Sequence, residues 1–282
     1  MQILDGKAVS LKLQQKIVDQ IEQLKTNGKR IPRLDVVIVG NDYGSIKYVE
    51  MKEKKALELG IIAKVHHLQE ETTTSEVEKL IHSLNKDNTV DGIMVQLPLP
   101  KHMDTNQVLQ AIDSSKDVDG LTPTNLGKLF QKDLSGIAPA TPVGIMELLD
   151  HYKIDIYAKN VVILGSSNII GVPLSAMMLE RKATVTLCNQ LTEHISKISK
   201  HADILVSATG KPKLVGRNFV KDGAIVMDVG SNKDPQTGKL VGDVNFEEVD
   251  GIPGYITPVP GGVGPMTIIS LILNLMKCYN AR

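Results

Sequence analysis

The residues best suited to proton transfer in this sequence are a tyrosine and a lysine four positions apart, Tyr48 and Lys52. They lie in the segment GSIKYVEMKEKKALELG, whose apolar spacing predicts a helix over 44–59, so the two side chains share one helix face. Neighbouring lysines of this segment are expected to be solvated. If Lys52 instead faces a buried crevice, burial lowers its pKa and allows it to exchange protons near neutrality.

Polar residues at the ends of predicted strands could accompany this lysine. Gln96 lies near the end of the apolar run VDGIMVQL (90–97), and Asp117 and Asp119 lie in KDVDG (116–120). In parallel sheets, the carboxyl ends of strands border the crevice in which ligands bind. A glutamine inside an apolar run also needs a hydrogen-bond partner, because burying it without one costs stability. We therefore predict Lys52, Gln96 and Asp119, with Tyr48, as catalytic residues.

A glycine-rich turn in VVILGSSNIIGVP (161–173) is a candidate for phosphate binding. Gly165 ends an apolar strand-like run, and a helix is expected to begin before Gly171. This arrangement directs backbone N–H groups and the positive end of a helix toward an anion. The spacing is GxxxxxG rather than the GxGxxG of most dinucleotide-binding turns, so the motif alone is of moderate specificity. We predict Gly165, Ser166 and Ser167 as cofactor-binding residues.

The segment after this turn leaves the choice of cofactor open. The strand ATVTLC (183–188) is followed by Asn189 and Gln190, where an NAD enzyme often carries an acid and an NADP enzyme a base. Amides can hydrogen-bond either cofactor. Later strands end in SATG (207–210) and DVGS (228–231), whose small residues suit the passage of a flat ligand. Gln190 and Ser231 complete the predicted cofactor-binding set.

The run PVPGGVGPMT (258–267) contains three prolines and three glycines between two apolar segments. It is unlike a flexible linker, which is polar and rich in Gly and Ser. Prolines fix φ and glycines allow positive φ and the approach of a ligand to bare backbone. The predicted ligand-lining residues of this run are Pro260, Gly261, Gly262 and Pro265.

Helical and strand-like patterns alternate along the chain, which indicates α/β architecture with mostly parallel sheets. A stretch rich in Pro, Gly and Thr (120–144) interrupts the alternation, and we place a hinge there. The predicted domains are 1–140, completed by the C-terminal helix 266–282, and a Rossmann-like nucleotide-binding domain, 141–265. A cleft is expected to separate them.

Composition excludes several classes of function. Lys plus Arg and Asp plus Glu number 32 each, so the chain has no overall basic field for nucleic acid. The two cysteines match neither a disulfide framework nor a CxxC motif, and the histidines lack zinc-like spacing, so we expect no metal. The N-terminal segment has no apolar signal core and no apolar run is long enough for a membrane span, which predicts a cytoplasmic protein.

Five of these segments together resemble one enzyme family: YVEMK (48–52), VQLPLP (95–100), KDVDG, the glycine turn and PVPGGVGPMT. They are similar, in order and over almost the whole chain, to the bifunctional methylenetetrahydrofolate dehydrogenase/cyclohydrolases. The resemblance implies oxidation of 5,10-methylenetetrahydrofolate with NADP and hydrolysis of the methenyl product to 10-formyltetrahydrofolate. It also implies a cytoplasmic homodimer, formed through the nucleotide domain, that serves one-carbon metabolism for purine and amino-acid biosynthesis.

The same resemblance assigns roles to the candidate residues. Tyr48 would stack on the aminobenzoate part of folate, and Lys52 would carry protons during hydrolysis. Gln96 would tune that lysine, and Asp119 would hold the pterin. The folate side would be lined by Pro260, Gly261, Gly262 and Pro265.

Three positions around the nucleotide turn depart from the family pattern. Members commonly carry Arg directly after the first glycine of the nucleotide turn and His-Ser after the next strand, where they are associated with the NADP phosphate. This chain has Ser166, Asn189 and Gln190 there. We therefore expect weaker discrimination between NADP and NAD than the family norm.

Three alternatives remain at the level of sequence. One is a two-domain dehydrogenase of shikimate or an amino acid, which also combines a lysine with a nucleotide domain but does not explain VQLPLP or PGGVGPMT. A second is a family member with dehydrogenase activity only, using NAD. The third is a nucleotide-sensing regulator without catalysis, against which the joint presence of Lys52, Gln96 and Asp119 argues.

Overall fold

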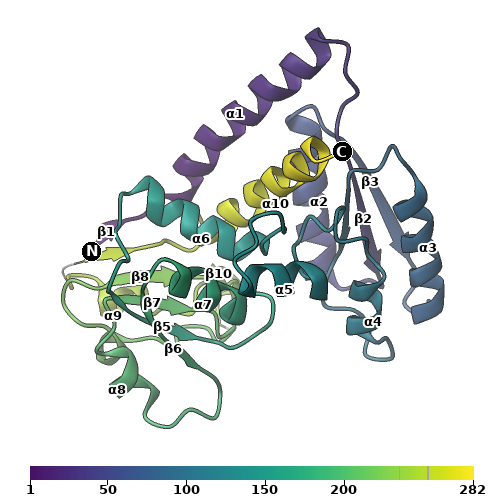
Figure 1. The fold of residues 1–282 in the computed structure, drawn as a ribbon. Coiled ribbons are helices and arrows are strands. Elements are labelled where there is room, and N and C mark those ends of the chain that lie inside the picture. The colour runs from purple at the N-terminus through teal and green to yellow at the C-terminus, as the bar shows by residue number, and fades with distance from the viewer. Residues whose placement is uncertain (235, 253) are drawn as a thin grey trace. The chain divides into compact units, whose positions relative to one another are not determined.

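The computed structural model describes residues 1–234, 236–252 and 254–282 (Figure 1). The chain divides into two compact units, and neither is a continuous stretch of sequence. One unit comprises Met1–Leu11 and Thr141–Thr267, and the other comprises Lys12–Ala140 and Ile268–Arg282. We call them the nucleotide unit and the lysine unit, after the glycine turn and Lys52 that they contain.

The lysine unit is built on a parallel sheet of three strands in the order β3-β2-β4. These strands are β2 (Arg33–Val39), β3 (Ile62–Leu68) and β4 (Gly92–Val95). The helices described within this unit are α2 (Tyr43–Glu58), α3 (Thr74–Lys86), α4 (Thr105–Gln110) and α5 (Pro123–Phe130). The helix predicted over 44–59 is thus confirmed.

Alternation along the strands separates two faces of this sheet. Val37, Val39, Ile93 and Val95 share a buried cluster with residues of α3 and α4, such as Ile81. Residues one position away, among them Met94, point to the opposite face because successive side chains of a strand alternate. Strand β4 is therefore buried on both sides, as its uniformly apolar sequence suggests.

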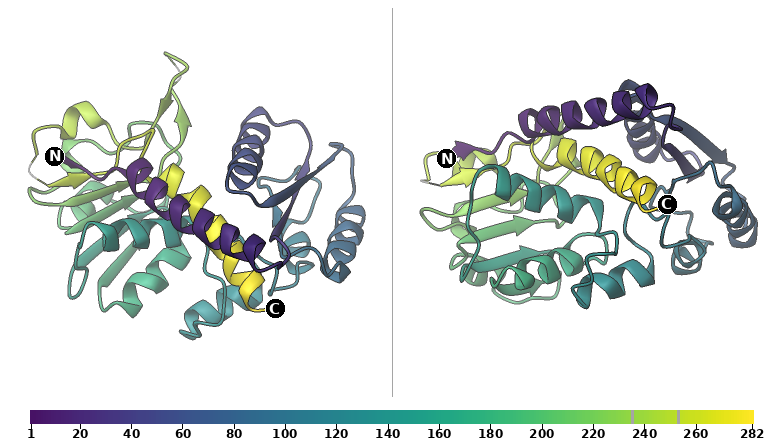
Figure 2. Two further views of the ribbon diagram at one scale, coloured as in Figure 1. Left: turned by 90° about the horizontal axis from the view of Figure 1, so that it is seen from above. Right: turned by 45° about the horizontal axis from the view of Figure 1, so that its top comes forward.

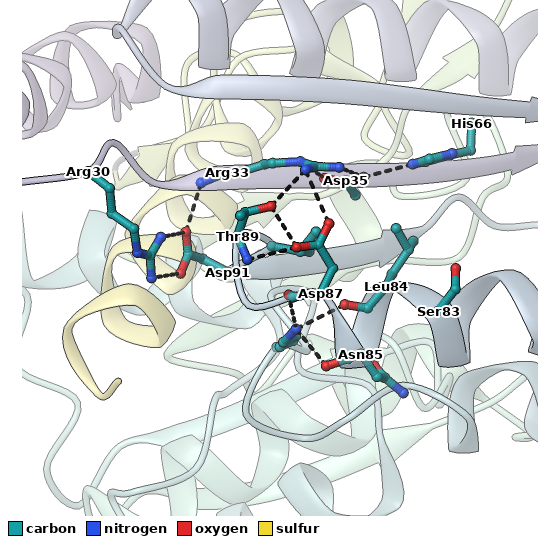
Figure 3. Close-up of polar contacts among 12 residues, drawn as sticks. Arg30, Arg33, Asp35, His66, Ser83, Leu84, Asn85, Asp87, Thr89 and Asp91 are labelled. Carbon is teal, nitrogen blue, oxygen red and sulfur yellow. Dashed lines mark hydrogen bonds and ion pairs between the residues drawn. The ribbon is translucent and has the colours of Figure 1, made fainter.

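Two buried carboxylates in the lysine unit are held by arginines (Figure 3). Asp91 accepts bidentate hydrogen bonds from Arg30 at 2.5 and 2.6 Å and one from the Arg33 backbone N–H at 2.9 Å. Asp35 accepts two from the Arg33 guanidinium, at 2.7 and 2.9 Å, and lies 2.7 Å from His66 Nε2. Both carboxylates are fully buried, and these charge-assisted hydrogen bonds hold the first residues of β2 and β4 in place.

The nucleotide unit contains a parallel sheet of six strands in the order β1-β11-β8-β7-β5-β6. Along the chain the strands are β1 (Gln2–Ile3), β5 (Asn160–Leu164), β6 (Thr184–Cys188), β7 (Ile204–Ser207), β8 (Ile225–Asp228) and β11 (Tyr255–Ile256). Strand β5 lies between β6 and β7, so the direction of winding reverses beside it. Such a switch point is where doubly wound sheets bind ligands.

Shorter elements complete the nucleotide unit. Helix α7 packs on strands β5 and β6 (Figure 2). The remaining elements are α6 (Ala140–His151), α7 (Gly171–Glu180), α8 (Ile195–Ser199), η1 (Arg217–Phe219), β9 (Asn232–Lys233), β10 (Leu240–Val241) and α9 (Phe246–Val249). Two longer helices, α1 (Gly6–Thr26) and α10 (Val263–Asn280), contribute residues to both units.

The predicted α/β fold with a Rossmann-like parallel sheet is confirmed, with local differences. Helix α10 begins at Val263 rather than 266, since Pro265 is compatible with a first helical turn. Helix α5 lies inside the stretch 120–144, where a hinge was predicted; Thr122 caps this helix and Pro123 is its first residue. Within the described residues, no helix combines the length and apolar character needed to cross a membrane.

Replacing Asp91 by alanine is expected to lower the free energy of unfolding by about 1.5–3 kcal/mol, because the Arg30 guanidinium and the Arg33 N–H would lose their charged acceptor. Urea denaturation measures the loss. The matched control is Glu22→Ala, which removes an exposed ion pair with Lys25 and is expected to cost less than about 1 kcal/mol. Equal effects of the two substitutions would contradict the structural role of Asp91.

Candidate functional site

Lys52 is a buried side chain of helix α2, with 8% of its surface exposed. Its Nζ atom donates hydrogen bonds to Gln96 Oε1 at 3.0 Å and to Met94 Sδ at 3.3 Å. Lys54 on the same helix has a side chain that is 79% exposed, and Lys47 also lies in solvent. The sequence alone could not distinguish Lys52 from these surface lysines, and the fold does so.

The register of β4 explains why two residues reach the same amine. Met94 pairs with Val36 in β2, and the Gln96 N–H donates to the Val37 carbonyl at 2.8 Å. Met94 and Gln96 are two positions apart, so their side chains leave the extended chain on the same face. Gln96 Nε2 donates to the Leu97 carbonyl at 2.6 Å, which directs Oε1 toward the lysine.

Burial dominates the electrostatics of this site. It lowers the pKa of Lys52, and the nearby Asp119 carboxylate opposes that shift. Burial also raises the pKa of Asp119, against the attraction of Lys52 and with a further contribution from Asp117. Both shifts bring proton exchange closer to neutral pH, where general acid–base catalysis is most effective.

Asp117 and Asp119 have different surroundings. Asp117 is buried and accepts hydrogen bonds from the Gly120 and Thr122 N–H groups and from Asn125 Nδ2, at 2.8 to 3.0 Å. It therefore shapes the turn that leads into α5. Asp119 is partly buried and lies within the electrostatic reach of Lys52.

Tyr48 lies one helical turn before Lys52 on α2. Its side chain is 38% exposed, so a flat ligand could reach the ring. The structure thus brings Tyr48, Lys52, Gln96 and Asp119 into the lysine unit together, and adds Met94. Sequence analysis missed Met94 because an apolar residue in an apolar strand gives no signal of contact with a charge.

In the nucleotide unit, the glycine turn closes tightly between β5 and α7. A Cβ atom on Gly171 would lie 1.8 Å from the Gly165 carbonyl oxygen, and one on Gly165 would lie 2.2 Å from the Ala208 carbonyl oxygen. Gly165 also has φ of +116°, which a residue with a side chain rarely adopts. Both glycines are thus required for the backbone to form this turn at the switch point.

The predicted polar residues of the cofactor set are exposed around this turn. Ser166 and Ser167 follow Gly165, and Ser167 Oγ accepts from the Ile170 N–H at 3.2 Å beside the start of α7. Gln190 and Ser231 are exposed in the segments after β6 and β8. All of these segments leave the carboxyl ends of parallel strands, where a dinucleotide binds in doubly wound sheets.

Two buried aspartates that the sequence analysis did not select organise the neighbouring loops. Asp243 Oδ2 accepts from Ser207 Oγ at 3.1 Å and from the Thr209 N–H at 2.6 Å. Its Oδ1 accepts from Asn232 Nδ2 at 2.8 Å. Asp243 therefore joins the loop after β7 to the loop after β8, which carries Ser231.

Asp228, at the end of β8, accepts the backbone N–H groups of Gly230, Asp243 and Val244 at 2.9 to 3.0 Å. Burial, with the adjacent Asp243, raises the pKa of Asp228 to about 6, although the three N–H groups oppose this. An acidic residue directly after the apolar run IVM was the available signal for a buried carboxylate.

The glycines of PVPGGVGPMT also belong to the nucleotide unit, as do Pro260 and Pro265. The Gly261 carbonyl accepts from the Lys7 N–H at 2.8 Å. A Cβ atom on Gly6 would lie 1.9 Å from the Gly262 carbonyl oxygen, so the run packs against the start of α1. The glycine-rich sequence of this run therefore serves, in part, the close packing of its backbone against the start of α1.

Within the described residues, no three His, Cys, Asp or Glu side chains cluster as a metal ion would require. His66 contacts Asp35, and His67 Nε2 lies 2.8 Å from the Gly40 carbonyl oxygen. Lys52, Asp119 and Gln96 supply the lysine unit with an amine, a carboxylic acid and an amide, which can carry or position a proton.

A parallel sheet with a glycine turn at its switch point, together with a separate unit that buries a lysine, defines an α/β enzyme with a nucleotide-binding domain. Two family models match the sequence. The model of the tetrahydrofolate dehydrogenase/cyclohydrolase catalytic domain matches residues 4–119, and the model of the NAD(P)-binding domain of the same family matches residues 139–282. The chain belongs to the tetrahydrofolate dehydrogenase/cyclohydrolase family.

Individual relatives cover the chain from end to end. The bifunctional protein FolD of a Nitratiruptor species is 47% identical over 282 residues, covering 100% of this chain and 99% of that protein. The crystal structure of the FolD enzyme of Campylobacter jejuni is 45% identical with a TM-score of 0.96, covering all of both chains. The Trypanosoma brucei enzyme, complexed with NADP cofactor and inhibitor, is 36% identical with a TM-score of 0.95, covering 99% of this chain and 97% of that one.

We expect Asp228 to titrate near pH 6 rather than near its ordinary value of 3.8, because burial outweighs its three hydrogen bonds. A raised pKa stabilises the fold below pH 4, and that contribution, about 3 kcal/mol, is lost as the pH rises through 6. Carboxyl ¹³C NMR, with the resonance assigned by Asp228→Asn, measures the midpoint. A midpoint below 3.8 would mean that the hydrogen bonds dominate instead.

Proposed function

We propose that this protein oxidises 5,10-methylenetetrahydrofolate to the methenyl cation with NADP and hydrolyses that cation to 10-formyltetrahydrofolate. The observation that carries the hydrolytic half is the buried Lys52 amine, hydrogen-bonded to Gln96 and close to Asp119. The support for the oxidative half is membership of the family and the NAD(P)-binding domain match.

Hydrolysis of the methenyl cation requires little beyond a positioned water and a group that carries protons. The carbon between N5 and N10 is already electrophilic, so water adds to it directly. Lys52, kept neutral more readily by its lowered pKa, accepts a proton from that water as the C–O bond forms. That proton is returned to N5 as the carbon–N5 bond breaks. The remaining hydroxyl proton is released to solvent as the C=O bond forms, which leaves the formyl group on N10.

Other residues of the lysine unit would bind and orient the folate. Tyr48 offers a partly exposed ring for stacking on the aminobenzoate group. Asp119, whose pKa is raised by burial, can donate or accept hydrogen bonds with the pterin. Gln96 holds the lysine amine in place. Lining roles for Pro260, Gly261, Gly262 and Pro265 are part of the same proposal.

The nicotinamide cofactor supplies the hydride acceptor for the oxidative step. Gly165, Ser166 and Ser167 would bind its pyrophosphate through backbone N–H and hydroxyl groups beside the start of α7. Gln190 and Ser231 would contact the rest of the nucleotide. The fit rests on the glycine turn, in which Gly165 and Gly171 leave the backbone free of side chains.

The quaternary structure proposed is a cytoplasmic homodimer formed through the nucleotide unit. Strand β6 is the last strand of its sheet, and Leu187 within it and Leu191 after it are 36% and 83% exposed. An exposed edge strand with apolar neighbours favours pairing with a second copy. We place this enzyme in the one-carbon metabolism that supplies purine and amino-acid biosynthesis.

Substituting Lys52→Met is expected to abolish hydrolysis of methenyltetrahydrofolate, lowering kcat by at least about a hundredfold, because the group that carries the proton is removed. The decay of methenyl absorbance measures this rate. Lys54→Met is the matched control, since that side chain is 79% exposed on the same helix, and it should retain wild-type hydrolysis. Hydrolysis at the wild-type rate by the Lys52 variant would refute the proposed role.

The alternatives are separated by the same assay. A dehydrogenase of shikimate or of an amino acid is not supported, since the family is established by both domains. A member without cyclohydrolase activity would accumulate methenyltetrahydrofolate without hydrolysing it, and a regulator would show no turnover. The Lys52–Gln96 hydrogen bond favours retention of hydrolysis.

Discrimination between NADP and NAD is expected to be weak, since Ser166 offers no positive charge to a 2′-phosphate. A charge-assisted hydrogen bond contributes about 1.5–3 kcal/mol, or roughly ten- to hundredfold in kcat/KM. Measuring kcat/KM for both cofactors tests this, and a thousandfold preference for NADP in the unmodified enzyme would contradict it. Ser166→Arg should increase the preference at least about tenfold, whereas Ser166→Gln, of similar length without charge, should not.

A further inference from the structure

Met94 is the second hydrogen-bond acceptor of the Lys52 amine, and the proposed hydrolysis gives it no role. Its Sδ atom lies 3.3 Å from Nζ, and the contact is buried. Met94 has no exposed surface, and its backbone is held in β4, an outer strand of the lysine-unit sheet, by pairing with Val36 of the central strand β2. A flexible side chain held at this position can keep the sulfur against the amine.

The contact between Met94 and Lys52 is compatible with both protonation states of the lysine. An ammonium has three N–H bonds, and a neutral amine has two and one lone pair. Gln96 Oε1 and Met94 Sδ together accept two N–H bonds. Both contacts can therefore persist in either protonation state, and only the third direction alternates between a proton and a lone pair.

The chemical nature of the acceptor also matters. A thioether sulfur is a weak, neutral acceptor, whereas a carboxylate oxygen in its place would stabilise the charged form of the lysine and make the amine a poorer base. The charged group that faces Lys52 is Asp119, which already opposes the effect of burial. Sulfur thus directs an N–H bond while adding little to the stability of the ammonium.

We propose that Met94 is a positioning residue for hydrolysis, which together with Gln96 confines the proton exchanged by Lys52 to a single direction. This inference rests on the proposed function of Lys52. Without the sulfur, the amine could rotate about the Cε–Nζ bond with one contact left, and the lone pair would spend time pointing away from the reacting water.

The first test is Met94→Leu, which removes the acceptor at similar volume and is therefore tolerated by most cores. We expect kcat for hydrolysis of methenyltetrahydrofolate to fall by about three- to thirtyfold, less than the hundredfold that a misplaced catalytic group can cost. KM should change less than twofold, because substrate binding is not altered. Thermal unfolding verifies that the variant is folded.

Met51→Leu is the matched control, since Met51 precedes Lys52 on α2 and is 53% exposed. It should retain the wild-type kcat and KM. Met94→Gln supplies a stronger oxygen acceptor in the same direction, and the limb of the pH–rate profile that reports Lys52 should move to higher pH. Wild-type kcat and an unchanged pH profile in Met94→Leu would overturn the proposal.

A second measurement uses the protein without a substitution at Met94. With methionine methyl groups labelled by ¹³C, one resonance should titrate with the same midpoint as hydrolysis, and this titration should be absent in Lys52→Met. If no methyl resonance responds to the loss of Lys52, the proposed contact is wrong. If Lys52→Met itself hydrolyses at the wild-type rate, the proposed role of the lysine fails, which is a different result from failure at Met94.

Discussion

The chemistry of the lysine unit depends on the burial of one amine. An exposed lysine is almost fully protonated at neutral pH and cannot accept a proton from water. Lys52 differs from the exposed lysines of α2 because its side chain is buried against the sheet, where its amine donates hydrogen bonds to Gln96 and Met94. Burial removes water from the amine and so lowers its pKa, and the two acceptors then determine the direction in which the amine exchanges a proton.

In the nucleotide unit, several loops come together at one edge of the sheet and leave space for a ligand there. Gly165 and Gly171 make the first turn compact, and Asp243 joins the loops after β7 and β8 through hydrogen bonds. Burying a carboxylate without partners is costly, and the hydrogen bonds that Asp228 and Asp243 accept from these loops offset that cost. The two units thus use buried charge for different purposes.

The amino-acid sequence predicted most of this arrangement, and the reasons for the failures are physical. Glycine and strand periodicity located the nucleotide turn, and the helical spacing of α2 placed Tyr48 and Lys52 on one helix. Asp243 and Met94 were missed because their roles arise from contacts between segments distant in sequence. Helix α5 was missed because its capping residues, Thr122 and Pro123, also occur in irregular loops. Local signals define elements, whereas partners of buried polar groups depend on the assembled fold.

The discontinuity of both units has a consequence for how the chain is made. Strand β1 is synthesised well before β11, yet the two strands pair through Tyr255 and Ile256 of β11. The lysine unit in turn requires the last helix, where Asn274 Nδ2 donates to the Val118 and Ala138 carbonyls and Lys277 to that of Gly136. Both units include residues of α10, so neither can complete its native contacts until that helix has left the ribosome.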